Sequence, residues 1–234
     1  MTTDKVIDGG DLGIVTVKRN PRAQRYILRI VEGRVVATMP VHGSEKELLK
    51  FINEKRNYLL TMLKKAPVKR VLDETTTLQT LTFALKIVRA PLQRFYATIK
   101  DGTLLVSCPE ESDFADPATQ ERLHNILENA LRYEAKRVLP MRLTDLAKQH
   151  GFVFTTVKIN NSRTHWGSCT ARKGINLSLS VMLLPEHLVD YILLHELCHT
   201  VEMNHGAQFW TLMHRVTECR TTSLRREIKR HKML

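Results

Sequence analysis

The stretch His195-Glu196-Leu197-Cys198-His199 closes an apolar segment that begins at Leu188, shortly after Pro185. Proline is favoured at the start of a helix, and the apolar residues have helical spacing, so the segment is predicted to be a buried α-helix. Residues of a helix advance by about 100° each, which places His195 and His199 one turn apart on the same face. Two imidazoles placed in this way can bind one metal ion.

Glu196 and Cys198 flank the histidine pair on opposite sides. Each lies about 80° from the centre of the pair, which is too far round the helix for a further ligand. A carboxylate beside a metal site can accept a proton from a metal-bound water, so Glu196 is the predicted catalytic base. Cys198 is predicted to be a packed thiol.

The third histidine of the segment is His205, in the sequence Asn204-His205-Gly206. A straight helix would carry it to the far side, so we expect the chain to turn before it, with Asn204 as the residue that best tolerates a positive φ. His205 is the predicted third ligand. Glu202 is the alternative, because some zinc sites use a downstream carboxylate. In a second alternative, the histidines are ordinary structural residues. Imidazole ligands favour zinc, although they suit other metals too. We expect one zinc ion per chain.

The segment before this helix is a candidate substrate site. A strand beside a metal-binding helix can offer its edge to an extended peptide, and Arg163 and His165 could direct a donor at an oxyanion. Equally, Arg163 could pair with a carboxylate and His165 could be a surface residue. Ser168 and Cys169 have no neighbouring base and are poor candidates for a nucleophile. The predicted substrate contacts are Arg163, His165, Trp166 and Asn176.

The hydrophobic periodicity elsewhere predicts an α+β fold, with a β-rich N-terminal region before a helical domain that contains a small sheet. We detect no internal repeat. The polar stretch 109–113 suggests a boundary between residues 1–115 and 116–234, and Pro140 is expected to kink or split the helix that contains it. The predicted elements are strands 14–18, 25–31 and 34–39, a helix from 44, with a capping box, to about 65, strands 81–88, 96–99 and 104–107, a helix 117–150, strands 152–159 and 174–181, and the helix after Pro185.

The composition limits the classes of protein to which the chain can belong. The 234 residues carry a formal net charge of +12 with a pI of about 9.7, which indicates either a solvated basic surface or a contact with nucleic acid. No apolar run is long enough for a membrane helix, and no secretory signal is recognisable at the start. The four cysteines form no CxxC pair, which favours a reducing compartment and therefore a cytoplasmic protein.

Four motifs stand out when taken together: Trp166-Gly167-Ser168-Cys169, the strand 175–177, the helix 191–199 and the tail 205–210. In this combination they resemble the YgjP-like metallopeptidase family, which comprises zincins related to the SprT-like proteases. The resemblance extends to the N-terminal part and is weakest over 68–115. One departure is His165, where the family usually has Arg. The ligand spacing also matches metzincins, but these have Gly at the position of Glu202, so we do not assign the chain to them.

The resemblance implies zinc bound by His195, His199 and His205, with Glu196 catalytic. We therefore predict a zinc-dependent metallohydrolase, a metallopeptidase that cleaves peptide bonds of a peptide or protein substrate through a zinc-activated water. The alternative is a zinc-stabilised nucleic-acid-binding module, or a protease recruited to DNA. The alternative follows from the charge and from the SprT-like relatives, which act on DNA-bound proteins.

Overall fold

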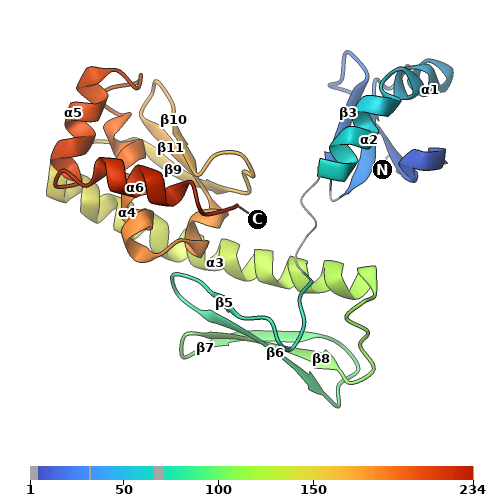
Figure 1. Ribbon diagram of the computed structural model, residues 1–234, viewed down its shortest axis with the longest axis horizontal. Coiled ribbons are helices and arrows are strands. Elements are labelled where there is room, and N and C mark those ends of the chain that lie inside the picture. Colours follow the sequence, from blue (N-terminus) through green and yellow to red (C-terminus); the bar gives the residue numbers. More distant parts are fainter. Residues whose placement is uncertain (1–4, 32, 66–70, 234) are drawn as a thin grey trace. The chain divides into compact units, whose positions relative to one another are not determined.

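The computed structural model describes residues 5–31, 33–65 and 71–233 (Figure 1). The chain forms two compact units, Met1–Arg70 and Val71–Leu234. A β-rich N-terminal region precedes a long helix, further helices and small sheets, which confirms the predicted α+β fold. Among the described residues, no helix combines the length and the apolar character that crossing a membrane requires.

The N-terminal unit is one four-stranded sheet with two helices on one face. The strand order is β1-β2-β4-β3, with β2 and β4 parallel and the other two pairs antiparallel. Alternate strand residues such as Val15, Val35 and Ala37 are buried against Leu48 and Ile52 of the first helix. The elements are β1 Lys5–Asp8, η1 Gly10–Leu12, β2 Ile14–Arg19, β3 Ile27–Val31, β4 Arg34–Met39, α1 Glu45–Glu54 and α2 Arg56–Lys65.

The single helix predicted from residue 44 to about 65 is two helices, because the backbone leaves helical geometry at Lys55 (φ −97°, ψ 4°). Ser44 occupies the N-cap position of α1, but its side chain makes no capping hydrogen bond. Its backbone N–H instead donates to the Tyr26 hydroxyl at 2.9 Å. The hydrogen bond at the start of α1 is therefore made to Tyr26, which directly precedes β3, and not to the side chain of the N-cap residue.

The second unit begins with another four-stranded sheet, in the order β5-β6-β8-β7, which packs against a long helix. Phe83, Ile87 and Val106 of this part are buried in the same core as Leu127 and Leu131 of the helix. The elements are β5 Leu78–Gln79, β6 Ala84–Ala90, β7 Tyr96–Lys100, β8 Thr103–Pro109 and α3 Pro117–His150.

Helix α3 runs through Pro140 without being split. Leu139 and Leu143, on either side of the proline, are both 0% exposed. Burial of this kind on both turns offsets the lost backbone hydrogen bond. The Thr144 hydroxyl donates to the Pro140 carbonyl at 2.8 Å, which adds a hydrogen bond in the turn that follows the proline.

The second half of α3 packs against the remaining elements of the unit. A three-stranded sheet has the order β10-β11-β9, in which β10 lies at an edge. Arg142 of α3 forms ion pairs with Asp190 and Glu186, which holds α3 to the helix that follows. The elements are β9 Thr156–Asn160, β10 Gly167–Cys169, β11 Gly174–Ser178, η2 Leu179–Leu183, α4 Glu186–Cys198, α5 Ala207–Val216 and α6 Thr221–Ile228.

The boundary between the two compact units falls between residues 70 and 71, whereas the sequence suggested a boundary between residues 115 and 116. The polar stretch behind that suggestion is a fixed turn. Arg89 of β6 donates to the carbonyls of Glu110 and Ser112 at 2.6 and 2.7 Å. The β5–β8 sheet also shares its hydrophobic core with α3.

The two four-stranded sheets repeat one another, which corrects the expectation that the chain has no internal repeat. In each, the first and second strands are antiparallel, the second and fourth are parallel, and the third pairs antiparallel with the fourth. Residues recur 69 positions apart at matching places in the two sheets; these are Gln24 and Gln93, Arg25 and Arg94, Ile30 and Ile99, Gly33 and Gly102, and Pro40 and Pro109. Few identities survive, so the repeat is visible mainly in the topology.

We predict that Leu139→Ala destabilises the second unit by about 2–5 kcal/mol, because it leaves a cavity at a fully buried position of α3. Met141→Ala is the matched control, since Met141 lies in the same helix and is 68% exposed. Its effect should stay within about 0.5 kcal/mol. Urea unfolding followed by circular dichroism measures both. Equal losses in the two variants would show that this part of α3 does not pack as described.

Candidate metal centre

Helix α4 places two of the predicted ligands side by side. His195 and His199 lie one turn apart, and their Nε2 atoms are 3.2 Å from each other. The helix itself is almost wholly buried, including Leu193 and Leu197 at 0% exposure. Its orientation, and with it the direction of both imidazoles, is therefore held by packing on several sides.

The chain turns directly after α4 and brings His205 back to the pair. Its Nε2 atom lies 3.1 Å from those of both His195 and His199. Backbone hydrogen bonds from Val201 and Glu202 to the Cys198 carbonyl form the turn. The predicted turn is thus present, but Asn204 does not have the positive φ expected of it. The candidate ligand atoms of the three histidines all lie within 4.8 Å of one another, so the group can hold a metal ion.

Glu202, the alternative ligand, contributes through its backbone. Its carbonyl accepts a hydrogen bond from His199 Nδ1 at 3.0 Å. A carbonyl can only accept, so Nδ1 carries the proton and Nε2 keeps the lone pair that a metal requires. In the described part of the chain, the Glu202 carboxylate does not belong to the group of possible ligands.

An aromatic cluster supports the three imidazoles. The Phe209 ring is 0% exposed, and its centroid lies 4.5 Å from that of His199, 4.7 Å from His205 and 5.0 Å from His195. Trp210 stacks on His205 at 5.6 Å and donates from Nε1 to the His205 carbonyl at 3.0 Å. The guanidinium of Arg225 covers the Trp210 ring at 4.6 Å. Rotation of the imidazoles away from one another would disrupt this packing.

The electrostatics of the cluster favour uncharged imidazoles. Burial lowers the pKa of His195 to about 3, with further contributions from His199, His205 and Arg225. Burial also lowers the pKa of His199. Uncharged imidazole is the form that binds metal ions, so these two histidines need lose no proton at neutral pH to act as ligands.

Glu196 directly follows His195 in the sequence. The residue is buried, with only 4% of its surface exposed. No described residue supplies a hydrogen bond to its Oε2 atom. Burial raises the pKa of the carboxyl to about 8. A neighbouring cation would favour the ionised carboxylate. A metal ion at the imidazoles is such a cation, so the donor set and the buried carboxyl together suit a metal centre.

Strand β10 lies against the Glu196 carboxyl. A Cβ atom added to Gly167 would be 2.6 Å from Oε1 and 2.8 Å from Cδ of Glu196. Only glycine therefore allows the strand to approach so closely. This contact explains why glycine stands at this position of the Trp166-Gly167-Ser168-Cys169 motif.

Residues 24–231 match the model of the YgjP-like family, described as a metallopeptidase domain. The chain belongs to the YgjP-like metallopeptidase family. Among solved structures it is similar to that of a metallopeptidase zymogen, abylysin from Pyrococcus abyssi. That similarity has 21% identity and a TM-score of 0.37, and it covers 42% of this chain and 100% of the other. No curated protein matches the chain. The family match alone carries the assignment.

The predicted substrate residues of this YgjP-like metallopeptidase lie before and within the small sheet. Trp166 is half-buried against the main core and Asn176 donates to the Ser168 hydroxyl at 3.3 Å. His165 is exposed, and its Nδ1 lies 2.8 Å from the Thr164 hydroxyl. Arg163 is also exposed. Substrate contact by these four residues stays a prediction.

Sequence reasoning missed two residues that shape the centre, Phe209 and Gly167. Phe209 stands four positions after His205, a spacing at which two residues of a helix share a face, but α5 begins only at Ala207. Gly167 had no local signal, because its partner Glu196 is distant in sequence. The prediction that Cys198 is a packed thiol is confirmed, since the residue is 0% exposed and burial raises its pKa to about 12.

We predict that Gly167→Ala lowers kcat for peptide hydrolysis by about 100-fold, because the new Cβ displaces the Glu196 carboxyl. Metal content should be unchanged, since the three atoms nearest to that Cβ all belong to Glu196 and not to the histidines. Gly206→Ala is the matched control, because a Cβ at Gly206 meets no atom within 4 Å. Elemental analysis and a peptidase assay measure the two effects. Full activity in Gly167→Ala would contradict the described contact.

Proposed function

We propose that this metallopeptidase is zinc-dependent, with one zinc ion held by His195, His199 and His205 and with Glu196 as the general base. The observation that carries the proposal is the convergence of three Nε2 atoms at 3.1–3.2 Å, together with a buried carboxyl at Glu196, the residue that follows His195. Imidazole donors suit zinc, and catalytic zinc sites have three protein ligands, whereas structural sites usually have four. The described residues offer a group of three.

Zinc at this position would supply Lewis acidity toward the peptide carbonyl and would lower the pKa of water toward about 7. The residues of the chain do the rest. The Glu196 carboxylate accepts the proton of the attacking water and later returns it to the leaving amine. Gly167 and the surrounding core exclude bulk water from that carboxylate, which is 4% exposed.

An extended peptide is the substrate that best suits the edge strand β10. Its only partner in the described part of the sheet is β11, so its other edge can pair with a peptide strand. Because Gly167 of this strand touches Glu196, a peptide added there would run close to the catalytic carboxyl. The proposed substrate contacts on this side are Trp166, which directly precedes β10, and Asn176 of β11. Arg163 and His165, in the segment before β10, are the other two proposed contacts.

Two further expectations remain predictions. The net charge of +12 is uneven, since residues 1–70 hold fifteen Lys and Arg against seven Asp and Glu, a balance of +8. This charge is the basis for expecting nucleic acid as a partner. A cytoplasmic location is inferred from the four cysteines, all of which are unpaired thiols.

We expect the purified chain to contain about one zinc ion per molecule, and His205→Ala to lose most of it, because two imidazoles alone bind zinc weakly. Elemental analysis after purification without added metal measures both. His214→Ala is the control, since His214 is exposed on α5 and is outside the histidine group. Full zinc in His205→Ala would remove this residue from the site.

We expect Glu196→Gln to keep its zinc but to lower kcat for peptide hydrolysis by about 10²–10⁴-fold, because an amide has a similar shape but cannot accept the proton. A peptide library read by mass spectrometry measures the rate. Glu202→Gln, at the neighbouring acidic residue, should hydrolyse peptides like the wild type. If Glu196→Gln and the wild type cleave alike, Glu196 is not the base.

A further inference from the structure

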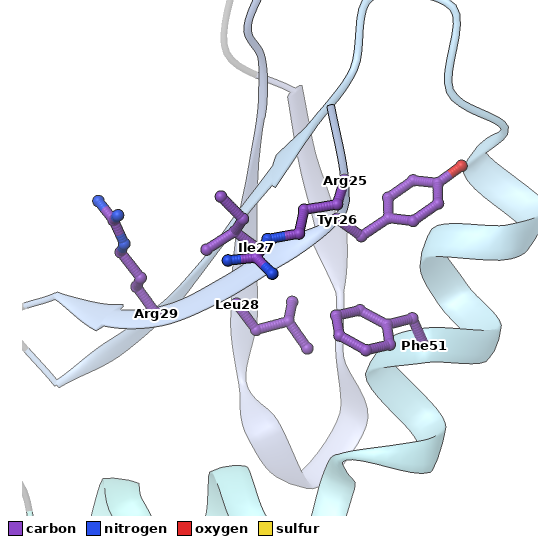
Figure 2. Close-up of a pocket in the computed structure, with 6 residues that line it drawn as sticks. All are labelled: Arg25, Tyr26, Ile27, Leu28, Arg29 and Phe51. Carbon is purple, nitrogen blue, oxygen red and sulfur yellow. The ribbon is translucent and has the colours of Figure 1, made fainter. Parts of the chain in front are cut away.

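A groove runs along the free edge of strand β3 in the N-terminal unit (Figure 2). Among the described residues, the strand order β1-β2-β4-β3 leaves one side of β3 without a neighbouring strand. The groove has a volume of about 580 Å³ and is lined by the consecutive residues 25–29 together with Phe51 of α1. Successive side chains of a strand point to opposite faces, so a groove lined by all five must follow the edge. Backbone N–H and C=O groups of alternate residues are therefore exposed along it.

One wall of the groove is apolar. Tyr26 and Leu28 pack partly against the core of the unit, whereas Phe51 does not belong to that core. The rings of Tyr26 and Phe51 lie 6.4 Å apart, and Figure 2 shows the Leu28 side chain directed toward Phe51. These three half-buried side chains form a surface that one apolar side chain of a partner can cover.

The other feature of the groove is its positive charge. Arg25 and Arg29 are both exposed and line it. The ion pairs of this unit join Lys5 and Arg19 to Glu45, and Arg56 to Asp11; within residues 5–31 and 33–65, none involves the two arginines of the groove. Residues 1–70 carry a balance of +8, so the unit as a whole is positively charged as well.

The second copy of the repeat lacks these open contacts. There, Arg94 stands in the place of Arg25, donates to the Tyr96 hydroxyl at 2.8 Å and covers the Tyr96 ring at 5.2 Å. The guanidinium of Arg122 lies 5.8 Å from the ring of Phe95, the counterpart of Tyr26. In the first copy, Ile27 occupies the place of Tyr96 and offers Arg25 neither a hydroxyl nor a ring.

We propose that this groove binds an extended acidic segment of a partner protein, which adds a strand to the free edge of β3. Main-chain hydrogen bonds to the edge supply affinity, as in other cases of β-augmentation. An apolar side chain of the segment covers Leu28 and Phe51, and its carboxylates pair with Arg25 and Arg29. The site lies outside the metal centre and does not depend on the proposed catalysis.

Two other occupants suit the groove less well. Phosphates only accept hydrogen bonds, whereas a strand edge offers donors and acceptors in alternation. A second copy of the chain, paired through its own β3, would bring Arg25 and Arg29 close to the same arginines, and like charges in opposite positions are unfavourable.

The test uses the full chain with Glu196→Gln, so that a peptide is not consumed at the metal centre. The probe is the fluorescein-labelled peptide Glu-Asp-Val-Leu-Val-Asp-Glu, followed by fluorescence anisotropy. We expect binding that is weakened about tenfold or more by the pair Arg25→Glu and Arg29→Glu, since a repulsive charge replaces an attractive one. Phe51→Ala should weaken binding as well. Backbone N-methylation of the peptide at one set of alternate residues should abolish binding, while methylation of the other set leaves it intact.

Matched controls separate this groove from general charge attraction. The pair Arg34→Glu and Lys46→Glu makes the same charge change at exposed residues outside the groove, and Leu49→Ala shortens an exposed side chain of α1. These variants should bind the peptide like the parent chain, with unchanged circular dichroism in all variants.

Equal weakening by the control pair would overturn the proposal, as would absence of peptide binding. Binding of oligothymidylate that only the groove variants lose would assign the surface to nucleic acid instead. A dimer in light scattering that the groove variants disrupt would assign it to a second copy.

Discussion

The burial of α4 on nearly all sides is the constraint on which the metal centre depends. Leu188, Val189, Leu193 and Leu197 are 0% exposed, and burial of each such side chain contributes about 1.5–3 kcal/mol. That apolar packing offsets the cost of taking the Glu196 carboxyl out of water. The cost appears as a pKa of about 8 for this group. A less deeply packed helix would let the carboxyl turn toward solvent, where its proton affinity would fall.

The surroundings of the centre restrict its side chains by shape. Gly167 leaves the Glu196 carboxyl no room to move toward β10, and Phe209 contacts all three imidazoles. The hydrogen bond from His199 Nδ1 to the Glu202 carbonyl fixes which ring nitrogen keeps its lone pair. The three histidines are therefore oriented before any ion arrives, which reduces the entropy that binding must overcome.

How far the sequence predicts this structure depends on the range of each interaction. The helix pair His195 and His199 follows from local periodicity, and the return of His205 follows from the need for a turn. The contact of Gly167 with Glu196 joins separate elements and has no local signal. The suggested boundary after residue 115 rested on polar composition, but Arg89 holds that stretch through backbone carbonyls, which composition does not reveal. Polarity therefore marked a solvated turn within one unit.

The sequence pattern alone did not reveal the internal repeat, because a sheet of this kind requires few specific residues. A sheet of this topology needs alternating apolar residues, a turn glycine such as Gly33 or Gly102, and little else that is specific. The two copies therefore retain the glycine and the apolar alternation while most other residues differ. The two copies differ clearly at the edge strand. In one copy Arg94 contacts the hydroxyl and the ring of Tyr96, whereas in the other copy Ile27 takes that place and Arg25 is exposed. An edge strand with exposed backbone groups invites unwanted pairing unless charge or a cover protects it. In the second copy the arginine is held by its own strand. In the first copy it projects from an open groove, where its charge repels other basic edges and attracts an acidic strand.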